Sequence, residues 1–144
     1  MALPLKPPAR AGRVRPLRTR GAHTVLTAHA IDELFRHAEV LTEGGLSGAT
    51  WYGSILITFD LARLLGGERE EELERLADAI GGSVRVRILA HRMARGQLHE
   101  RYPDRSIGTA HVESHFRRAG ALLLLDVDLE ASIEVASTRS RRAR

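Results

Sequence analysis

One segment of the chain constrains the fold most, because residues 50–65 are apolar almost all round. The strongly polar interruptions in it are Ser54, Thr58, Asp60 and Arg63. A segment of this kind has to be buried on most of its surface. We predict a central helix over 50–65, capped at Thr50 and ended by a Gly-Gly pair at 66–67.

A strand is the alternative for part of the same segment. Ile55, Ile57 and Thr58 are β-branched, and such side chains favour extended backbone. A strand over 54–59 therefore stays open. If 50–65 is a helix, we expect this helix to form an apolar core wrapped by a sheet. If 54–59 is a strand, a helix and a strand over 84–91 follow it, and this order predicts a ferredoxin-like α+β sandwich.

Two further helices are predicted from apolar residues spaced three and four positions apart. The first has its apolar stripe at Ile31, Leu34, Phe35 and Ala38. The chain can also leave this helix as a short strand over 37–42. The second covers 68–80, begins with an acidic first turn and ends at a Gly-Gly pair.

The second half of the chain alternates between apolar and polar residues, as half-buried strands do. We predict strands over 83–91, 109–117 and 121–129, with 133–135 either as a further short strand or as a continuation of the last one. The stretch 93–107 is predicted as a strand end and a loop, and 118–120 as a turn. Helices followed by strands joined by short turns indicate an α+β domain, with an antiparallel sheet packed on helix.

The charges divide the chain into an acidic middle and two basic ends. Residues 1–22 hold six of the 22 Lys and Arg residues and no acid, and 137–144 hold four. The other 12 basic residues share 23–136 with all 18 acidic ones. We predict one globular domain over 23–136, a flexible basic arm before it and a basic tail after it. An acidic body repels phosphate, so nucleic acid is expected to bind only through the two ends.

Composition argues against several classes of protein. Without cysteine, the chain has no disulfide framework, thiolate zinc site or cysteine nucleophile. Its longest apolar run, 121–125, is far shorter than a membrane span, and no apolar stretch follows the N-terminal arginines as in a secretory signal. We therefore expect a cytoplasmic protein that does not bind membranes. Nucleophile-elbow, Walker, dinucleotide-binding and His-Glu-x-x-His motifs are missing, and no cofactor is expected.

Residues 51–53 are Trp-Tyr-Gly, and Asp60 follows Gly53 by seven positions. This spacing and the element order resemble the hotdog fold of acyl-CoA thioesterases and dehydratases, in which a long antiparallel sheet wraps a central apolar helix. The thioesterase branch enters that helix through a His-Gly-Gly-like turn with an acid at the same spacing. The resemblance covers about residues 31–136 and implies a homodimer or larger oligomer. Trp51 and Tyr52 depart from the family's histidine and first glycine.

The resemblance implies an acyl-CoA or other acyl thioester substrate and gives several residues a role. Asp60 would activate water, or attack, at the thioester carbonyl, with Thr58 as a hydrogen-bond donor. Backbone N–H groups of Gly53 and Ser54, at the start of the helix, would hold the carbonyl oxygen. The plainer interpretation of Asp60 is a solvent-facing carboxylate beside Arg63.

Four further residues are candidates for substrate binding. Trp51 and Tyr52 lie at the helix entry, where they would form a pocket wall or simply pack in the core. Arg92 and Arg95, flanked by His91 and His99, form a local basic patch. Arginine matches phosphate bidentately, so this patch would hold the phosphates of a CoA-type ligand unless it is only solvated.

Two sets of side chains have the residue types of cation ligands. On a strand over 109–117, His111, Glu113 and His115 share one face, and two imidazoles and a carboxylate are suitable ligands for zinc. Asp126 and Asp128, with Glu130, alternate along the last long strand. Without a matching ligand elsewhere, solvated strand faces explain both sets, and no metal site is predicted.

The sequence thus leads to a thioesterase-like protein of hotdog fold that hydrolyses or binds acyl thioesters. The alternative from another class is a non-catalytic α+β interaction module. A third interpretation is a nucleic-acid-associated protein that uses its two arginine-rich ends. Whether 50–65 is a helix wrapped by a sheet distinguishes the first two.

Overall fold

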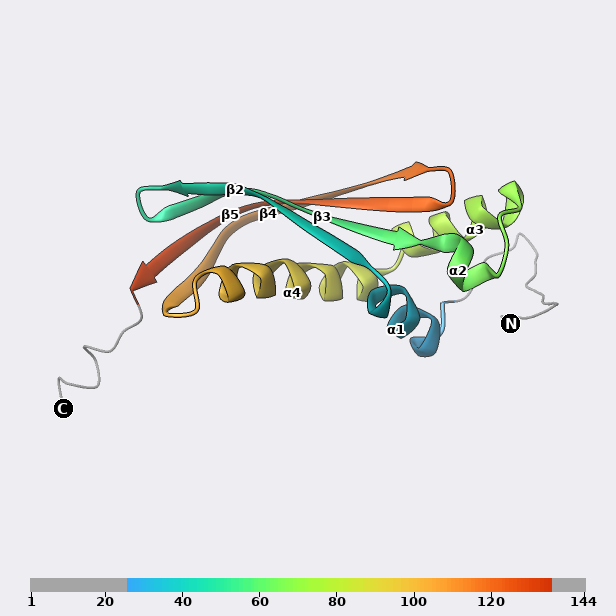
Figure 1. Ribbon diagram of the computed structural model, residues 1–144, viewed down its shortest axis with the longest axis horizontal. Helices are drawn as coiled ribbons and strands as arrows, with labels where there is room; N and C mark the ends of the chain where they lie inside the picture. Colours follow the sequence, from blue (N-terminus) through green and yellow to red (C-terminus); the bar gives the residue numbers. More distant parts are fainter. Residues whose placement is uncertain (1–25, 136–144) are drawn as a thin grey trace. The chain divides into compact units, whose positions relative to one another are not determined.

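The computed structural model describes residues 26–135, which form an α+β fold. In chain order the elements are α1 (Ala28–Arg36), β2 (Glu39–Ser47), β3 (Thr50–Asp60), α2 (Leu61–Leu65), α3 (Glu70–Gly81), α4 (Val84–Arg101), β4 (Arg105–Ala119) and β5 (Leu122–Val135). Figure 1 shows their arrangement. The predicted basic ends, 1–22 and 137–144, lie outside the described residues.

The four strands form one antiparallel sheet in the order β2-β3-β5-β4. At one end of the β3–β5 pair the Ile133 N–H donates to the Ala49 carbonyl, and at the other the Leu61 N–H donates to the Ala121 carbonyl. Both bonds belong to the same antiparallel register. This register places Tyr52 opposite residue 130.

The described chain divides into two compact units. The first, here called the helical unit, comprises described residues up to 39 together with 58–86 and 116–124. The second, here called the sheet unit, comprises 40–57, 87–115 and the described residues from 125 onward. The helical unit thus holds α1, α2 and α3, and the sheet unit holds most of the four strands and of α4.

Short polar contacts define the helices of the helical unit. The Thr27 hydroxyl caps α1 by accepting from the Ala30 N–H at 3.0 Å. Three consecutive acidic residues occupy the first turn of α3, where the helix dipole favours negative charge. The rings of Phe35 and Phe59 meet edge to face, 5.2 Å apart. Apolar side chains buried in this unit are Ile31, Leu34, Phe59, Leu61, Leu73, Leu76, Ile80, Val86 and Leu123.

In the sheet unit, α4 lies along one face of the sheet (Figure 1). Ala90, Ala94 and Leu98 recur every fourth residue on α4 and are buried. From the strands, the buried side chains include Trp51, Ile55, Ile57, Leu125, Val127, Leu129, Ala131 and Ile133. Within the part of the chain that the structure describes, no helix covers the other face of this unit's strands.

Three side-chain hydrogen bonds join α4 to the strands inside the sheet unit. Thr42 donates to Gln97 at 3.4 Å, and Arg87 donates to the Ser114 hydroxyl at 2.7 Å. Arg95 donates to the carbonyl of Ile107 at 3.0 Å. The side chains of Thr42 and Ser114 identify the α4 side of β2 and β4, and their neighbours on each strand therefore point to the open side.

The helix predicted over 50–65 is wrong, and the strand alternative over 54–59 is confirmed. Positions 51, 55, 57 and 59 are buried, while those between them are only half-buried or exposed, which is the period of a strand. Only 61–65 are helical, and Gly66, with φ 74°, ends that turn. The apolar helix that the hotdog resemblance needs at this place is therefore not formed.

The strand predicted over 83–91 and the loop predicted within 93–107 are also wrong, because α4 covers most of both. The hydroxyl of Ser83 accepts from the Val86 N–H at 3.1 Å, the bond of a helix N-cap. Val86 is buried together with the every-fourth-residue series on α4. Apolar and polar residues alternate over 84–91, but the residues that pack in the core recur at the spacing of a helix.

The remaining elements are confirmed in outline. Of the predicted stripe, Ile31, Leu34 and Phe35 belong to α1, whereas Ala38 follows the end of this helix. The helix predicted over 68–80 is α3, and the strands over 109–117 and 121–129 belong to β4 and β5. Residues 133–135 continue β5 as predicted. The turn between β4 and β5 includes Gly120, which has a φ of 62° and belongs to the turn predicted over 118–120.

Candidate functional site

Gly53 and Ser54 lie inside β3, not at the start of a helix. The free N–H groups predicted to hold a thioester carbonyl require a helix N-terminus, so this prediction is corrected. Gly53 has a packing role instead. A Cβ on it would lie 2.3 Å from the Glu43 carbonyl oxygen and 2.5 Å from Cη2 of Trp51. No side chain fits between these groups.

Trp51 and Tyr52 are consecutive in β3 and point to opposite faces of the sheet. Trp51 is completely buried, and its indole Nε1 has no hydrogen-bond partner among the described residues. The side chain of Tyr52 is half exposed on the open side. The two residues therefore cannot line one pocket, and core packing accounts for Trp51.

Asp60 is the last residue of β3 and the N-cap of α2. Its Oδ1 accepts from the Arg63 N–H at 3.2 Å. Thr58 precedes it by two positions on the same side of the strand and is half-buried. The structure thus gives the Asp60 carboxylate a capping partner, and its predicted role as a base or nucleophile stays a prediction.

Arg92 and Arg95 are exposed on α4, in a helix and not in the predicted strand end and loop. Arg95 is held by its bond to the Ile107 carbonyl. His91, one position before Arg92, has a buried Nε2 without a partner in the described chain. Burial and the charge of nearby Arg87 lower the pKa of His91 below its ordinary value of 6.5.

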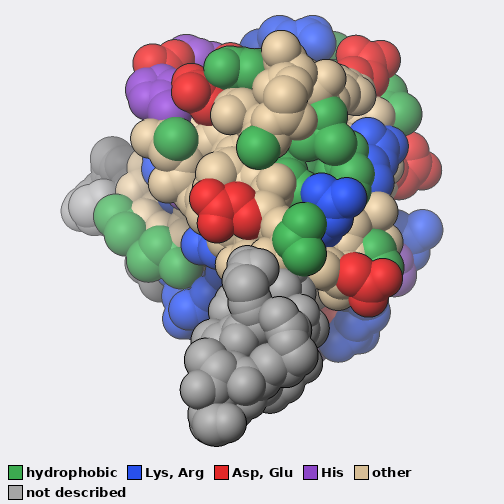
Figure 2. Space-filling view, turned by 90° about the vertical axis from the view of Figure 1, so that its left-hand side faces the viewer, with side chains coloured by type: hydrophobic (Ala, Val, Ile, Leu, Met, Phe, Trp, Pro, Cys, Tyr) green, Lys and Arg blue, Asp and Glu red, His purple; other side chains and the backbone are tan. Residues whose placement is uncertain are grey.

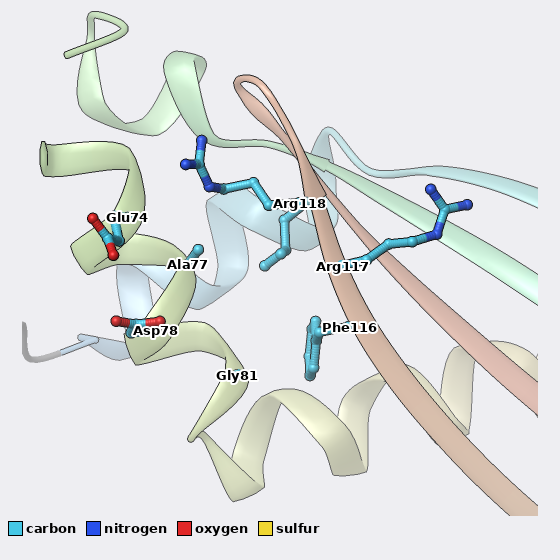
Figure 3. A pocket seen from close by; sticks show the side chains of 8 residues that line it. Glu74, Ala77, Asp78, Gly81, Phe116, Arg117 and Arg118 are labelled. Atoms are coloured by element: carbon cyan, nitrogen blue, oxygen red, sulfur yellow. The ribbon is translucent and has the colours of Figure 1, made fainter. Parts of the chain in front are cut away.

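A hollow of about 360 Å³ lies in the helical unit, between α3 and the turn end of the β4–β5 hairpin. Its lining residues are Glu74, Ala77, Asp78, Gly81, Phe116, Arg117, Arg118 and Leu123. Figure 3 shows the guanidinium groups of Arg117 and Arg118 pointing away from each other. Arg118 is also bonded to the Glu70 carboxylate and the Gly120 carbonyl. The polar groups therefore do not converge on one ligand position.

Histidine and carboxylate side chains do converge on the open side of the sheet unit. The Nε2 atom of His115 lies 3.7 Å from Oε1 of Glu113 and 3.8 Å from Oδ2 of Asp128. The other carboxylate oxygen of Glu113 lies 3.2 Å from Nε2 of His111. We call His115, Glu113 and Asp128 the triad. One potential ligand atom from each of its members lies within 4.8 Å of the other two.

The triad belongs to a strongly acidic surface, here called the open face. Its outward carboxylates in the sheet unit are Glu43, Glu113, Asp126, Asp128, Glu130 and Glu134. Arg105, at the first position of β4, is the only Lys or Arg in the strand segments of this unit. Figure 2 shows histidine and acidic side chains side by side at the top of the view, where Figure 1 has the sheet.

Comparison of the chain with family models, with curated proteins and with solved structures found no match. Among the described residues, no helix combines the length and the hydrophobicity that a membrane span requires.

Sequence reasoning found the members of the triad but not their relationship. The alternation of residues places His111, Glu113 and His115 on one strand face, as the structure confirms, but it does not connect them to Asp128. The missing signal is the pairing of β4 with β5, which brings Asp128 beside His115. A hairpin turn at Gly120 is the part of that pairing which the sequence does predict.

Proposed function

We propose that this protein is a non-catalytic interaction module, and that its open face binds a basic polypeptide segment of a partner protein. One observation carries the proposal. The outward positions of the sheet unit hold six carboxylates, and Arg105, at the first position of β4, is the only Lys or Arg in the strand segments of this unit, although Arg117 follows two residues beyond His115 on the same strand. Complementary charge steers and orients protein partners, and this face suits arginine and lysine.

Apolar side chains on the same face support a polypeptide as the occupant. Leu41 and Tyr52 are each about half exposed, at 54% and 50%. The β3–β5 register places Tyr52 opposite Glu130 and Leu56 opposite Asp126. A segment that carries both basic and apolar residues would match this neighbourhood, whereas the phosphates of a nucleic acid would be repelled.

The proposal is tested by fluorescence anisotropy with two short synthetic peptides of equal length. One alternates arginine with leucine and glycine, and the other has glutamate in place of arginine. The full chain should bind the arginine peptide alone, and the affinity should fall between about 50 and 300 mM salt because the charges become screened. The triple variant Glu43→Gln/Asp126→Asn/Glu130→Gln should bind it at least tenfold more weakly, and this variant leaves the triad intact.

A matched control neutralises three acids on another surface. Glu71→Gln/Glu74→Gln/Asp78→Asn removes the same charge from exposed positions of α3 in the helical unit. This control should bind the peptide like the unmodified chain. Equal losses in both triple variants would mean that only the net charge matters, and the proposed face would then be rejected.

The homodimer expected from the sequence becomes one outcome of the same experiments. Because Arg92 and Arg95 are exposed on α4, a second copy would also offer basic side chains. Sedimentation of the full chain at micromolar concentration would then show a dimer that dissociates in salt and in the Glu43→Gln/Asp126→Asn/Glu130→Gln variant. That result would show that the open face binds a second copy of this chain and not a segment of another protein. Hydrolysis of acyl thioesters stays a prediction from the sequence.

A further inference from the structure

We infer that the triad is a binding site for a divalent transition-metal ion, with zinc as the best match. Glu113 and His115 come from β4, and Asp128 comes from the neighbouring strand β5. The inference does not rest on the proposed partner binding, because it concerns only the geometry of these three side chains.

The distances in the triad suit metal ligands better than they suit hydrogen bonds. At 3.7 and 3.8 Å, the two contacts of the His115 imidazole are too long for hydrogen bonds. Two ligands around a tetrahedral zinc ion, each bound at the usual length, lie ~3.4 Å apart. The two contacts of His115 are within a few tenths of an ångström of this separation, and rotation of the exposed carboxylates, whose oxygens lie within 4.8 Å of each other, would complete the coordination sphere.

The donor types select the ion. Mg²⁺ and Ca²⁺ prefer coordination by oxygen alone, whereas an imidazole nitrogen favours zinc and its transition-metal neighbours. One imidazole and two carboxylates make three protein ligands, which leaves a fourth position for water or another ligand. Two carboxylates also supply the negative charge that a dication compensates.

His111 acts as a positioning residue in this arrangement. Its Nε2 is 3.2 Å from the Glu113 oxygen that does not face His115. A contact of this kind can hold a ligating carboxylate in one orientation and is typical of the groups behind metal ligands. His111 is therefore expected to affect the metal affinity less than His115 does.

The members of the triad are also accessible to a hydrated ion. The side chains of His115, Glu113 and Asp128 are 65%, 55% and 52% exposed. Since none of them is packed in the core, each can be replaced without opening a cavity. The substitutions that test the site should therefore leave the fold intact.

The test is calorimetric titration of the untagged full chain with zinc chloride, and with magnesium chloride in parallel. Zinc should bind saturably with one ion per chain, and magnesium should not. His115→Ala and Asp128→Asn should each weaken zinc binding at least tenfold, and His111→Ala should weaken it less. The control is His37→Ala, which removes another exposed histidine that lies 3.5 Å from a glutamate, Glu33. It should leave zinc binding unchanged.

A second readout is the thermal unfolding of the same proteins. Because the ligands come from two strands, zinc should raise the Tm of the unmodified chain by binding the folded state alone. This rise should be missing in His115→Ala. The inference is overturned if zinc does not saturate, or if its affinity in His115→Ala equals that of the unmodified chain. It is also overturned if His37→Ala weakens zinc binding as strongly as Asp128→Asn.

Discussion

The indole of Trp51 lies directly over Gly53, so that a Cβ on the glycine would stand 2.5 Å from Cη2. The same Cβ would lie 2.7 Å from the Cα of Gly44 on the paired strand β2. Two strands and a completely buried aromatic ring thus meet where only glycine has room. Gly53 thus determines how closely β2 and β3 approach.

Gly53→Ala is therefore expected to destabilise the protein strongly. The added methyl group has to displace backbone atoms of β2 as well as the ring, and overpacking of this kind costs about 2 kcal/mol or more. Urea denaturation measures the loss. Gly45→Ala is the matched control. Gly45 lies in the neighbouring strand β2, and a Cβ added to it would have no atom within 4 Å. If both variants unfold at the same urea concentration, the close contact at Gly53 does not exist.

Asp60→Ala should cost about 1 kcal/mol of stability, because α2 loses its N-cap. The reason is the bond from the Arg63 N–H to the Asp60 carboxylate. Asp60→Asn keeps a carbonyl oxygen that can accept the same bond, so it should lose much less. Thermal unfolding of the two variants separates the cap from the charge. Equal losses would show that the charge, and not the cap, is what matters.

The catalytic role predicted for Asp60 has its own measurement. If the chain hydrolyses acyl thioesters with this carboxylate as base, Asp60→Asn should lower turnover by about a hundredfold or more. A panel of short, long and aromatic acyl-CoA substrates is the assay. No hydrolysis by the unmodified chain would leave only a binding role, and equal rates in both proteins would remove Asp60 from the mechanism.

His91 should make the stability depend on pH. Burial and the charge of Arg87 lower the pKa of its imidazole in the folded state, so the unfolded chain takes up this proton at higher pH than the folded one. The free energy of unfolding should therefore rise with pH from the lowered pKa up to about 6.5 and stay level above it. As the pH falls through this interval, stability is lost.

Denaturation of His91→Leu between about pH 5 and 7 tests this dependence. The variant should lose the part of the slope that His91 contributes. His99→Leu changes an exposed histidine on the same helix and is the control for removing an imidazole from α4. A slope unchanged by His91→Leu would assign the pH dependence to other groups.

Local patterns in the sequence determined the elements that a single turn or a single face can specify. The helical stripe at Ile31, the acidic first turn of α3 and the turn at Gly120 each act through neighbours in the chain. Their free energies depend on residues within about four positions, so the sequence alone predicts them. The alternation in β4 likewise placed His111, Glu113 and His115 on one face.

Tertiary structure decided the elements whose local signals conflict. Residues 50–65 are apolar enough for a buried helix, but pairing of β3 with both β2 and β5 makes 50–60 a strand. Residues 84–91 alternate like a strand, yet the series Val86, Ala90, Ala94 and Leu98 packs as one helical face. In both cases burial over many residues outweighs propensities that differ by less than about 1 kcal/mol each.

The triad likewise depends partly on the sequence and partly on the tertiary structure. Its residue types are visible in the sequence, but Asp128 stands 13 positions after His115, and only the pairing of β4 with β5 makes them neighbours. Cross-strand contacts form when the sheet forms, and their free energy comes from the sheet as a whole. The sequence therefore determined which side chains face outward, and the sheet decided which of them meet.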